Sequence, residues 1–540
     1  MQVKGSVLGL STLAIVTLSG CTSTMITPTS DDVDIVTTKV VTKGEQEDKQ
    51  PDSTVEIVHP EEEVIVELPV EQVAPIEDVW ERVAMQLSFD VPQQQRIDAQ
   101  RNWYLKHPKY MQRVMRRGSP FIHYIVEQIE ARNMPLEFAL LPIVESAFDP
   151  FAYSHGRAAG LWQFVPGTGK RFGMKQTWWY DGRRDVIAST QGALDYLEYL
   201  YEFFDGNWLH ALAAYNSGEG RVRRAVRANA RAGKPTDFWS LNLPRETRAY
   251  VPKLLALADI LKHKETYNFD WPAVDNAPVV AVVETGSQID LALAAELAGM
   301  ETDALHALNP GFNRWATDPN GPHQLLLPMG KASQFSQALA QVDRSERLNW
   351  VRHKVKSGDS LLKLAKKYHT TADVIRQVNQ LDGNVIIAGK HLMVPVAAKD
   401  LDSYSLSNEA RLAAKQNTPR ARHKLTHEIQ SGDTLWDISR KYKVNLSSLA
   451  KWNGMAPKDP LMPGKQLVVW TDTVNASTNP NAIMRKIVYK VRRGDSLSRI
   501  ANRFGVKTND IVKWNDLNAS RYLQPGQTLT LHIDVTRSSS

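Results

Sequence analysis

Hydrophobic residues recur at helical spacing through most of residues 76–268. An apolar residue returns every three or four positions, as on one face of an α-helix; the segments that follow this rule are 79–87, 93–105, 109–116, 120–132, 135–145, 186–204, 208–216, 218–230 and 245–262. Between 147 and 183, small and aromatic residues replace the pattern. The sequence therefore predicts an all-α domain over 76–268, with a cleft formed by the irregular 147–183 segment and a turn at 215–219.

The C-terminal half repeats a different pattern three times. Three segments align without gaps: HKVKSGDSLLKLAKKYHTTADVIRQVN (353–379), HEIQSGDTLWDISRKYKVNLSSLAKWN (427–453) and YKVRRGDSLSRIANRFGVKTNDIVKWN (489–515). Each continues into a Gly-containing turn and an apolar strand. The pattern predicts a strand, a Gly-Asp turn, a helix capped by Ser or Thr, a second helix ending at Asn, and a closing strand. We therefore expect three small β-α-α-β modules at 351–397, 425–471 and 487–533.

A fourth, degenerate copy of the repeat lies at 275–345. It keeps a strand-like Val283-Glu284-Thr285-Gly286 run, an Ala-rich helix, a Leu305–Asn309 segment and an apolar Leu325–Pro328 strand. Its Gly-to-Asn distance is 23 instead of 21, and the Asp-Ser pair is absent. We expect a packing domain that rests against the helical body and does not bind sugar.

The N-terminus carries the pattern of a secretory signal. Lys4 precedes a short apolar stretch, Val7–Leu18, that is too short to span a bilayer and ends in small residues. The run ending at Cys21 resembles a bacterial lipobox, which implies a signal peptide at 1–21 and a lipid on Cys21. Ordinary signal cleavage with an incidental thiol is the alternative. Thr22 follows in place of Asp, which implies the periplasmic face of the outer membrane.

Residues 22–75 form an acidic segment that predicts a disordered tether. From Asp31 to Trp80 there are fifteen Asp or Glu and three Lys, a balance of −12, whereas the whole chain is +6. Like charges repel and the segment has no helical period, so we expect it to stay extended. It would hold the rest of the protein away from the anchoring membrane.

One carboxylate stands out within the helical region. Glu145 follows an apolar run, Phe138–Val144, that would remove its carboxyl from water and raise its pKa, so that it could donate a proton near neutral pH. Taken alone, a Glu at a helix end usually faces solvent. The polar motifs that accompany Glu145 in the sequence favour a catalytic role instead. They are Ser146, Ser154, Gly160-Leu161-Trp162-Gln163, Ala214-Tyr215-Asn216 and Glu246-Thr247-Arg248-Ala249-Tyr250-Val251.

These ordered motifs resemble the soluble lytic transglycosylase family, whose catalytic domain is goose-lysozyme-like. Trp162 stands where the family usually has Met, and no polar position is missing. The resemblance implies that Glu145 protonates a glycosidic oxygen and then accepts a proton from the substrate's own C6 hydroxyl. It also implies that Asn216 and Tyr215 stabilise the cation-like transition state, that Glu246 supports the polar network, and that Tyr250 hydrogen-bonds to Glu145. Cleavage would give an anhydro-muramic end without consuming water.

The predicted cleft should bind sugar. Aromatic faces suit the apolar faces of pyranose rings, and about half of the following residues should instead fill the core: Tyr153, Trp162, Phe164, Trp178, Trp179, Tyr180 and Tyr215. Ser146, Ser154, Gln163 and Asn216 offer neutral groups that can orient hydroxyls and amides. Ser154 could equally cap a helix.

The three C-terminal repeats resemble the lysin motif, a module that binds chains containing N-acetylglucosamine. The resemblance places the glycan beside the Gly-Asp-Ser/Thr turns, which are Gly358-Asp359-Ser360, Gly432-Asp433-Thr434 and Gly494-Asp495-Ser496. The Gly would also permit the turn, and the Asp would cap the helix. Polar stretches at 397–425 and 471–485 predict flexible linkers, so that three weak sites combine on one polymer.

The remaining features limit the alternatives. A secreted protein does not meet nucleic acid, and a positively charged body suits the carboxylates of cell-wall glycopeptide. With one cysteine and no HExxH pair among fourteen His, the chain predicts no metal or cofactor. Two other functions stay open: a wall-binding scaffold without catalysis, and a muramidase if Asp149 or Glu219 faced Glu145 as a second carboxylate. We expect a monomer whose partner is the peptidoglycan glycan strand.

Overall fold

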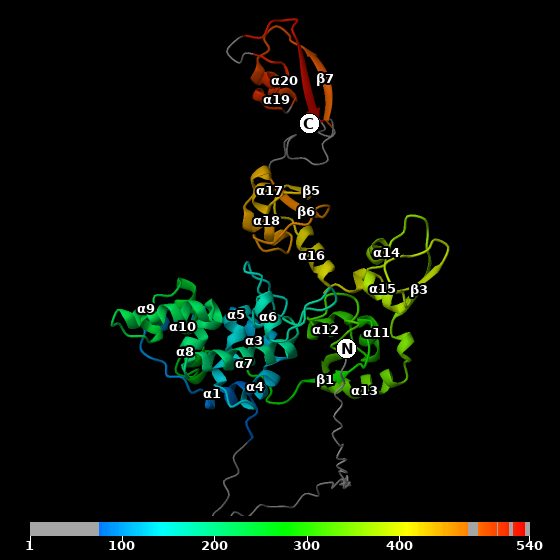
Figure 1. The fold of residues 1–540 in the computed structure, drawn as a ribbon. Helices are drawn as coiled ribbons and strands as arrows, with labels where there is room; N and C mark the ends of the chain where they lie inside the picture. Colours follow the sequence, from blue (N-terminus) through cyan, green and yellow to red (C-terminus); the bar gives the residue numbers. More distant parts are fainter. Residues whose placement is uncertain (1–74, 473–483, 505, 518–521, 535–540) are drawn as a thin grey trace, which may run out of the picture. The chain divides into compact units, whose positions relative to one another are not determined.

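The computed structural model describes residues 75–472, 484–504, 506–517 and 522–534 (Figure 1). The predicted signal peptide, Cys21 and nearly all of the acidic tether therefore lie outside the described residues. No helix in the described part of the chain is both long and apolar enough to cross a membrane.

The first domain is all-α, as the apolar spacing predicts. Its elements are α1 (Val79–Met85), α2 (Gln95–Leu105), α3 (Pro108–Gly118), α4 (Ile122–Glu130), η1 (Leu136–Leu140), α5 (Leu141–Ser146), α6 (Pro166–Arg171), α7 (Val186–Phe203), α8 (Trp208–Ser217), α9 (Glu219–Arg231), η2 (Phe238–Ser240) and α10 (Arg245–Lys262). One apolar cluster holds these helices together, with members from Val79 to Trp271 and also Leu326 from the next domain. The long α10 is buried along most of its length and lies at the centre of this core.

The predicted helix 135–145 is divided in two. Residues Leu136–Leu140 form a 3₁₀ turn, and a six-residue α-helix follows. Pro142 explains the division, because it has no amide hydrogen to donate to the carbonyl of Phe138. The short α5 then carries Glu145 near its end.

The second domain contains β1 (Val280–Glu284), α11 (Leu291–Leu297), α12 (Thr302–Leu308), β2 (Gln324–Pro328), α13 (Met329–Ala340) and η3 (Arg344–Glu346). We call residues 279–346 the LysM-like domain, after the lysin-motif repeat that its sequence resembles. Its strands pair antiparallel, with Val282 opposite Leu326. Its core also includes Trp179 and Tyr180 from the helical domain. The backbone amide of Asp181 donates to Gly311 over 2.8 Å, and Asn313 donates back to Trp179 over 2.7 Å. These contacts join the LysM-like domain to the helical domain.

Three further β-α-α-β modules follow, each with a two-stranded antiparallel sheet and its own apolar core (Figure 1). Module 1 consists of β3 (Asn349–Lys354), α14 (Leu361–Lys367), α15 (Ala372–Val378) and β4 (His391–Val396). Module 2 consists of β5 (His423–Glu428), α17 (Leu435–Tyr442), α18 (Leu446–Trp452) and β6 (Gln466–Thr471). Module 3 consists of β7 (Met484–Lys490), α19 (Leu497–Phe504), α20 (Thr508–Trp514) and β8 (Thr528–Asp534).

The Asn that ends the second helix has the same structural role in all four copies. In module 2, Asn453 donates to Leu449 and Val468 carbonyls over 2.9 and 2.8 Å and accepts from the Val468 amide over 2.7 Å. The equivalent residues Asn309, Asn379 and Asn515 make the same three contacts with their own helix and strand. The Asn therefore fastens the second helix to the closing strand, which explains its fixed place in the repeat.

The stretch between modules 1 and 2 is not the flexible linker that its polarity predicted. It contains η4 (Leu401–Ser403) and α16 (Asn408–Asn417), and Tyr404 between them is buried. The Tyr404 hydroxyl lies 2.9 and 3.0 Å from the two carboxylate oxygens of Asp290 in the LysM-like domain. The prediction failed because these contacts are made with a residue more than a hundred positions away. The second linker falls mostly outside the described residues.

Candidate active site and glycan-binding turns

Glu145 stands where α5 ends abruptly. Ala147 and Phe148 adopt left-handed backbone angles, with φ of 53° and 51°. Their amides donate to the carbonyls of Ile143 and Pro142 over 3.2 and 3.1 Å, which closes the helix. The turn directs the chain away immediately after Ser146, so the Glu145 side chain lies at the helix end and is only partly exposed.

The surroundings of Glu145 favour its neutral form. Burial raises the pKa of this carboxyl to about 7, against the opposing hydrogen bond from Tyr250. The negative charge of Glu246 raises the pKa further, and the positive charge of Lys253 lowers it. A carboxylic acid with this pKa is protonated for part of the time at neutral pH. It can therefore give up a proton and later take one back.

Two tyrosines hold this region together. The Tyr250 hydroxyl donates to Glu145 Oε1 over 2.5 Å, which is the contact predicted from the sequence. Tyr215 donates to the carbonyl oxygen of Trp162 over 2.9 Å. Burial raises the pKa of both phenols well above the usual value, so both stay protonated donors.

The glycine-rich motif lies against the Glu145 turn. Ser146 Oγ donates to the carbonyl oxygen of Leu161 over 2.9 Å. Gly160 has a φ of 83°, and a Cβ atom there would come within 1.7 Å of the Arg183 carbonyl oxygen, so only glycine fits. Gln163 Nε2 donates to the Gly160 carbonyl over 2.8 Å. The motif is thus a compact turn whose backbone fits tightly between two other segments.

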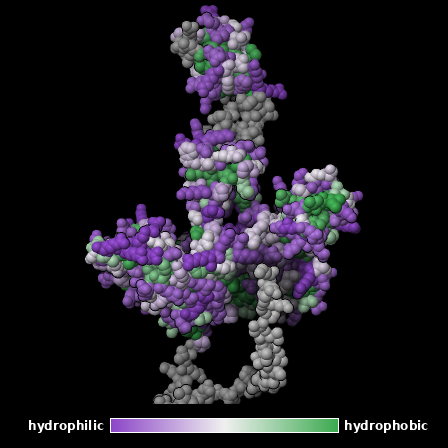
Figure 2. Space-filling model, in the orientation of Figure 1, coloured by the Kyte–Doolittle hydropathy of each residue, from purple (hydrophilic) through white to green (hydrophobic). Residues whose placement is uncertain are grey.

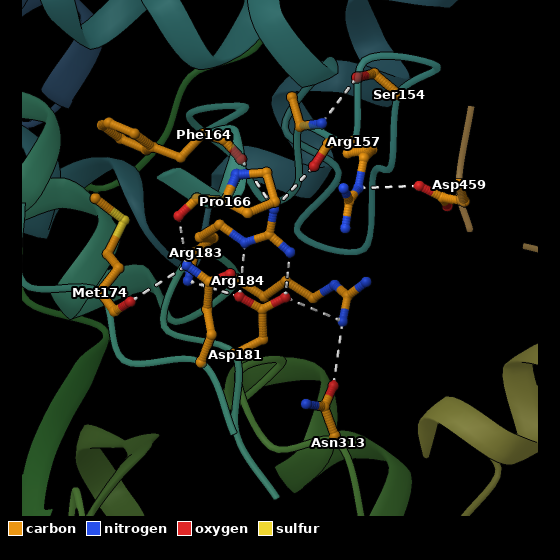
Figure 3. Close-up of polar contacts among 12 residues, drawn as sticks. Ser154, Arg157, Phe164, Pro166, Met174, Asp181, Arg183, Arg184, Asn313 and Asp459 are labelled. Atoms are coloured by element: carbon orange, nitrogen blue, oxygen red, sulfur yellow. Dashed lines mark hydrogen bonds and ion pairs between the residues drawn. The ribbon is translucent and has the colours of Figure 1, made fainter. Parts of the chain in front are cut away.

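Arg183 forms hydrogen bonds to the irregular segment at residues 157 and 164 (Figure 3). Its buried guanidinium pairs with both carboxylate oxygens of Asp181 over 2.9 and 2.8 Å, and it donates to the carbonyls of Arg157 and Phe164. The neighbouring Arg184 donates to Asn313 Oδ1 in the LysM-like domain over 3.1 Å. Because these groups come from three separate stretches, they fix the 154–166 loop in place.

The motif at residues 246–251 also contributes Thr247, to which the sequence assigns no role of its own. Thr247 is buried, and its hydroxyl donates to Asn216 Oδ1 over 2.8 Å. Glu246, to which the family resemblance gives the polar network, is exposed, and its side chain makes no hydrogen bond with the described residues. It affects the site through the pKa of Glu145. The phase of α10 could have identified Thr247, because it lies on the same helix face as Tyr250 and Leu254.

Ser154 lies further along the irregular segment. Its Oγ accepts from the amides of Gly156 and Ala158 over 3.2 and 3.0 Å, so the hydroxyl closes its own loop. This is local capping, the alternative that the sequence left open, although here it stabilises a loop and not a helix. No contact brings Ser154 to Glu145 among the described residues.

The aromatic residues of the predicted cleft divide between core and surface. Trp162, Phe164, Trp179 and Tyr180 are buried, whereas Tyr153, Trp178 and Tyr215 are partly exposed. The Trp162 indole donates to Thr190 Oγ1 over 3.1 Å inside the core. Trp179 and Tyr180 belong to the core shared with the LysM-like domain and do not form a cleft wall. The sequence could not show this, because their packing partners lie more than a hundred residues further along the chain.

The two acids considered as second carboxylates have other partners. Asp149 Oδ1 accepts from the Phe151 amide over 2.9 Å, and Glu219 lies 3.8 Å from Arg171. Neither contributes to the pKa of Glu145. Among the residues that the structure describes, no group of three His, Cys, Asp or Glu side chains could hold a metal ion.

In the three modules, each residue of the Gly-Asp-Ser/Thr turn supports the fold. Gly358, Gly432 and Gly494 have φ of 86°, 90° and 90°, which a side chain rarely tolerates. The hydroxyls of Ser360, Thr434 and Ser496 accept from the amide three residues later and so begin the first helix. These hydroxyls, and not the Asp residues, cap the helices.

The Asp of each turn binds a residue on the opening strand. Asp433 Oδ2 accepts from the Gln430 amide over 2.8 Å and lies 2.9 Å from His427 Nε2. Asp359 pairs with His353 in the same way, and in module 3 the Tyr489 hydroxyl donates to Asp495. These contacts lower the pKa of Asp359, Asp433 and Asp495. The sequence assigns no role to these partners, although His, His and Tyr are the first residues of the three aligned repeats.

The residue after the first helical position faces solvent in all three modules. Leu362 is 76% exposed and Trp436 is 56% exposed, and Ser498 is exposed as well. In the same module Val385 and Ile387 are also exposed, and Figure 2 shows an apolar patch on module 1. Side chains on the rim of the Gly-Asp turn are therefore free to meet a ligand.

Comparison with known proteins connects these regions. The family model of the transglycosylase SLT domain matches residues 124–238, that of the LysM-like domain of lytic transglycosylase MltD matches 279–344, and that of the LysM domain matches 353–395, 427–470 and 489–531. Membrane-bound lytic murein transglycosylase D of Escherichia coli (strain K12) is 36% identical over 464 residues, which are 85% of this chain and 87% of that protein.

Two more partial likenesses accompany these. A protein of Alteromonas sp. (strain M-1) named for tributyltin chloride resistance is 42% identical over 167 residues, which are 31% of this chain and 79% of that protein. The crystal structure of the 70 kDa soluble lytic transglycosylase of Escherichia coli is 20% identical over 31% of this chain and 30% of that one, with a TM-score of 0.22. That score is too low to bear on the fold.

Proposed function

We propose that Glu145 is the catalytic acid and base of this protein. The chain belongs to the family of membrane-bound lytic murein transglycosylase D and is a lytic transglycosylase. The proposed substrate is the β-1,4 bond between N-acetylmuramic acid and N-acetylglucosamine in peptidoglycan. The observation that carries this assignment is a partly exposed carboxyl at a helix end, with a pKa raised to about 7 and a hydrogen bond from Tyr250.

The reaction needs one group that works in both directions. Protonated Glu145 gives its proton to the glycosidic oxygen as the bond to the anomeric carbon breaks. The carboxylate then takes the proton of the C6 hydroxyl of the same muramic acid, and that oxygen bonds to the anomeric carbon. The product is a 1,6-anhydro end, and no water is consumed. Because the nucleophile belongs to the substrate, it is already held close to the reacting carbon.

The neighbouring side chains would bind and orient the sugar. We assign Gln163, Tyr215 and Asn216 to its polar groups, and Ser146 and Tyr250 to keeping the Glu145 turn in place. Glu246 acts through its charge. The structure gives least support to a sugar contact from Ser154, because its hydroxyl already accepts hydrogen bonds from two amides of its own loop.

The LysM modules bind peptidoglycan, and we propose that the glycan lies along the turns at 358–360, 432–434 and 494–496. The exposed side chains beside these turns support this placement, since Leu362 and Trp436 offer apolar surface to sugar rings. Three weak sites on one chain would raise the effective affinity for a repeating polymer.

We further propose that the protein is a monomeric lipoprotein held by Cys21 at the periplasmic face of the outer membrane. The lipobox-like run ending at Cys21 and the acidic tether that follows support the anchor. Mass spectrometry of the mature N-terminus tests it directly, because acylated Cys21 would carry the mass of its lipid. An unmodified Cys21 would rule the anchor out.

The experiment that tests the catalytic assignment is digestion of purified peptidoglycan by the Glu145→Gln variant. We expect anhydro-muramic products to disappear while sedimentation with peptidoglycan is unchanged. Glu219→Gln, which removes an acid paired with Arg171, serves as the matched control and should keep its activity. Unchanged product yield from Glu145→Gln would overturn the assignment, and wild-type products heavier by one water would identify a muramidase.

The pH profile gives a second measurement on the same residue. The proton donor is the neutral acid, so the rate should fall as pH rises through about 7, where Glu145 loses its proton. A profile of kcat/KM against pH reports this group in the free enzyme. A flat profile between pH 6 and about 8 would contradict the raised pKa.

A further inference from the structure

Helix α10 places two hydroxyl groups in the site, three residues apart. Tyr250 donates to Glu145 Oε1 over 2.5 Å, and Thr247 donates to Asn216 Oδ1 over 2.8 Å. Both residues are buried on the same face of the helix, whereas Glu246 is exposed. One rigid element therefore orients both the proposed acid and the proposed amide.

The hydrogen bond from Thr247 has a chemical consequence for Asn216. An amide has one accepting end and one donating end. Because Oδ1 accepts from Thr247, the remaining polar group of the side chain is Nδ2, which makes no hydrogen bond with other described residues. Asn216 is partly exposed, so its N–H groups are left for a ligand.

We propose that Thr247 is a positioning residue, which fixes Asn216 so that its amide offers hydrogen-bond donors to the substrate. The partner would be a sugar oxygen, such as the carbonyl of an N-acetyl group, which needs a donor. A flipped amide would present its own oxygen to that carbonyl and repel it. This inference rests on the proposed function, because it assumes that Asn216 faces the sugar.

The test compares Thr247→Val, which keeps the shape and loses the hydroxyl, with Thr247→Ser, which keeps the hydroxyl. We expect kcat of Thr247→Val to fall roughly fivefold to tenfold, the effect of one neutral hydrogen bond. KM should change little and the pH profile should keep its midpoint, because Glu145 and Tyr250 are untouched. Thr247→Ser should recover most of the rate.

Ser217→Ala is the matched control. Ser217 follows Asn216 directly, but its hydroxyl donates to the Ala213 carbonyl of its own helix over 2.8 Å. Its loss should leave kcat unchanged. Melting temperatures of all variants distinguish a destabilised fold from a misoriented Asn216 amide, because only the first lowers the melting temperature.

A double-mutant cycle with Asn216→Ala decides whether Thr247 acts through the amide. If it does, the double variant is no slower than Asn216→Ala alone. Three outcomes would each overturn the inference. Thr247→Val could keep full activity, or Thr247→Ser could be as slow as Thr247→Val. In the double variant, the rate losses of the two single variants could multiply. Glu145→Gln in the same assay tests the proposed function separately, because its activity should be lost whatever Thr247 does.

Discussion

The LysM-like domain and module 2 share one fold and differ in what covers it. Both pair an opening and a closing strand, and both fasten the second helix with an Asn, Asn309 or Asn453. The second residue of the first helix separates them. Trp436 in module 2 is 56% exposed, whereas the equivalent Ala292 is fully buried.

The covered face of the LysM-like domain meets the rest of the chain. Trp179 and Tyr180 of the helical domain enter its core, and Tyr404 reaches Asp290 at the start of α11. The Asp of the Gly-Asp turn is absent there, so the groups that shape the turn in modules 1 and 2 are missing as well. The comparison teaches that the residues that build this fold are separable from those that keep a face open for ligand.

The largest effect should come from Trp179→Ala, which removes a buried indole from the shared core. We expect a loss of about 3–5 kcal/mol in stability, as for other large buried aromatics. The loss should be confined to the LysM-like domain and its contact with the helical domain. Hydrogen exchange resolved along the chain would detect it as faster exchange in β1 and β2. Equal loosening of module 2 would contradict the separation of the two regions.

The shared Asn predicts a matched pair of effects. Asn309→Ala and Asn453→Ala each remove three hydrogen bonds, which at about 1 kcal/mol apiece should destabilise each unit by about 2–4 kcal/mol. Local unfolding in denaturant, followed by hydrogen exchange in β2 and β6, measures both. A large effect in one copy and none in the other would show that the two copies are not built alike.

The exposed face predicts a smaller effect on binding. Trp436→Ala should weaken sedimentation with peptidoglycan several-fold, because one aromatic face contributes about 0.5–1.5 kcal/mol. The assay is best made with the Glu145→Gln variant, so that the wall is not digested. Val282→Ala is the control, since Val282 is an exposed apolar residue of the LysM-like domain. Equal loss in both variants would show that the LysM-like domain also binds.

The smallest expected effect is a loss of stability of modules 1 and 2 at low pH. The pKa values of Asp359 and Asp433 are lowered in the folded modules, so their stabilisation is present above the unfolded pKa of about 4 and is lost as pH falls below it. Modules 1 and 2 should therefore loosen at their Gly-Asp turns below about pH 4, whereas the equivalent turn of the LysM-like domain has no Asp to titrate. Asp433→Asn should remove the difference in module 2. Exchange rates compared between pH 3 and about 6 would reveal it.

Local patterns predicted the elements well and their partners less well. The helical period located α10 to the residue, and the spacing of 21 identified the three modules. The contact of Tyr250 with Glu145 came from a family resemblance and is present in the structure. The same reasoning chose Glu246 for the polar network when the buried neighbour was Thr247, because a motif does not state which side of the helix faces inward.

By itself the sequence determined the order of the domains, the bounds of α10 and the turns built on Gly358, Gly432 and Gly494. These depend on neighbours within a few residues, whose spacing and backbone preferences are written locally. Only the tertiary structure decided that Trp179 packs into the LysM-like domain, that Tyr404 reaches Asp290, and that Thr247 orients Asn216. Such contacts join surfaces far apart in the chain, and their fit depends on shape and burial that no short pattern encodes.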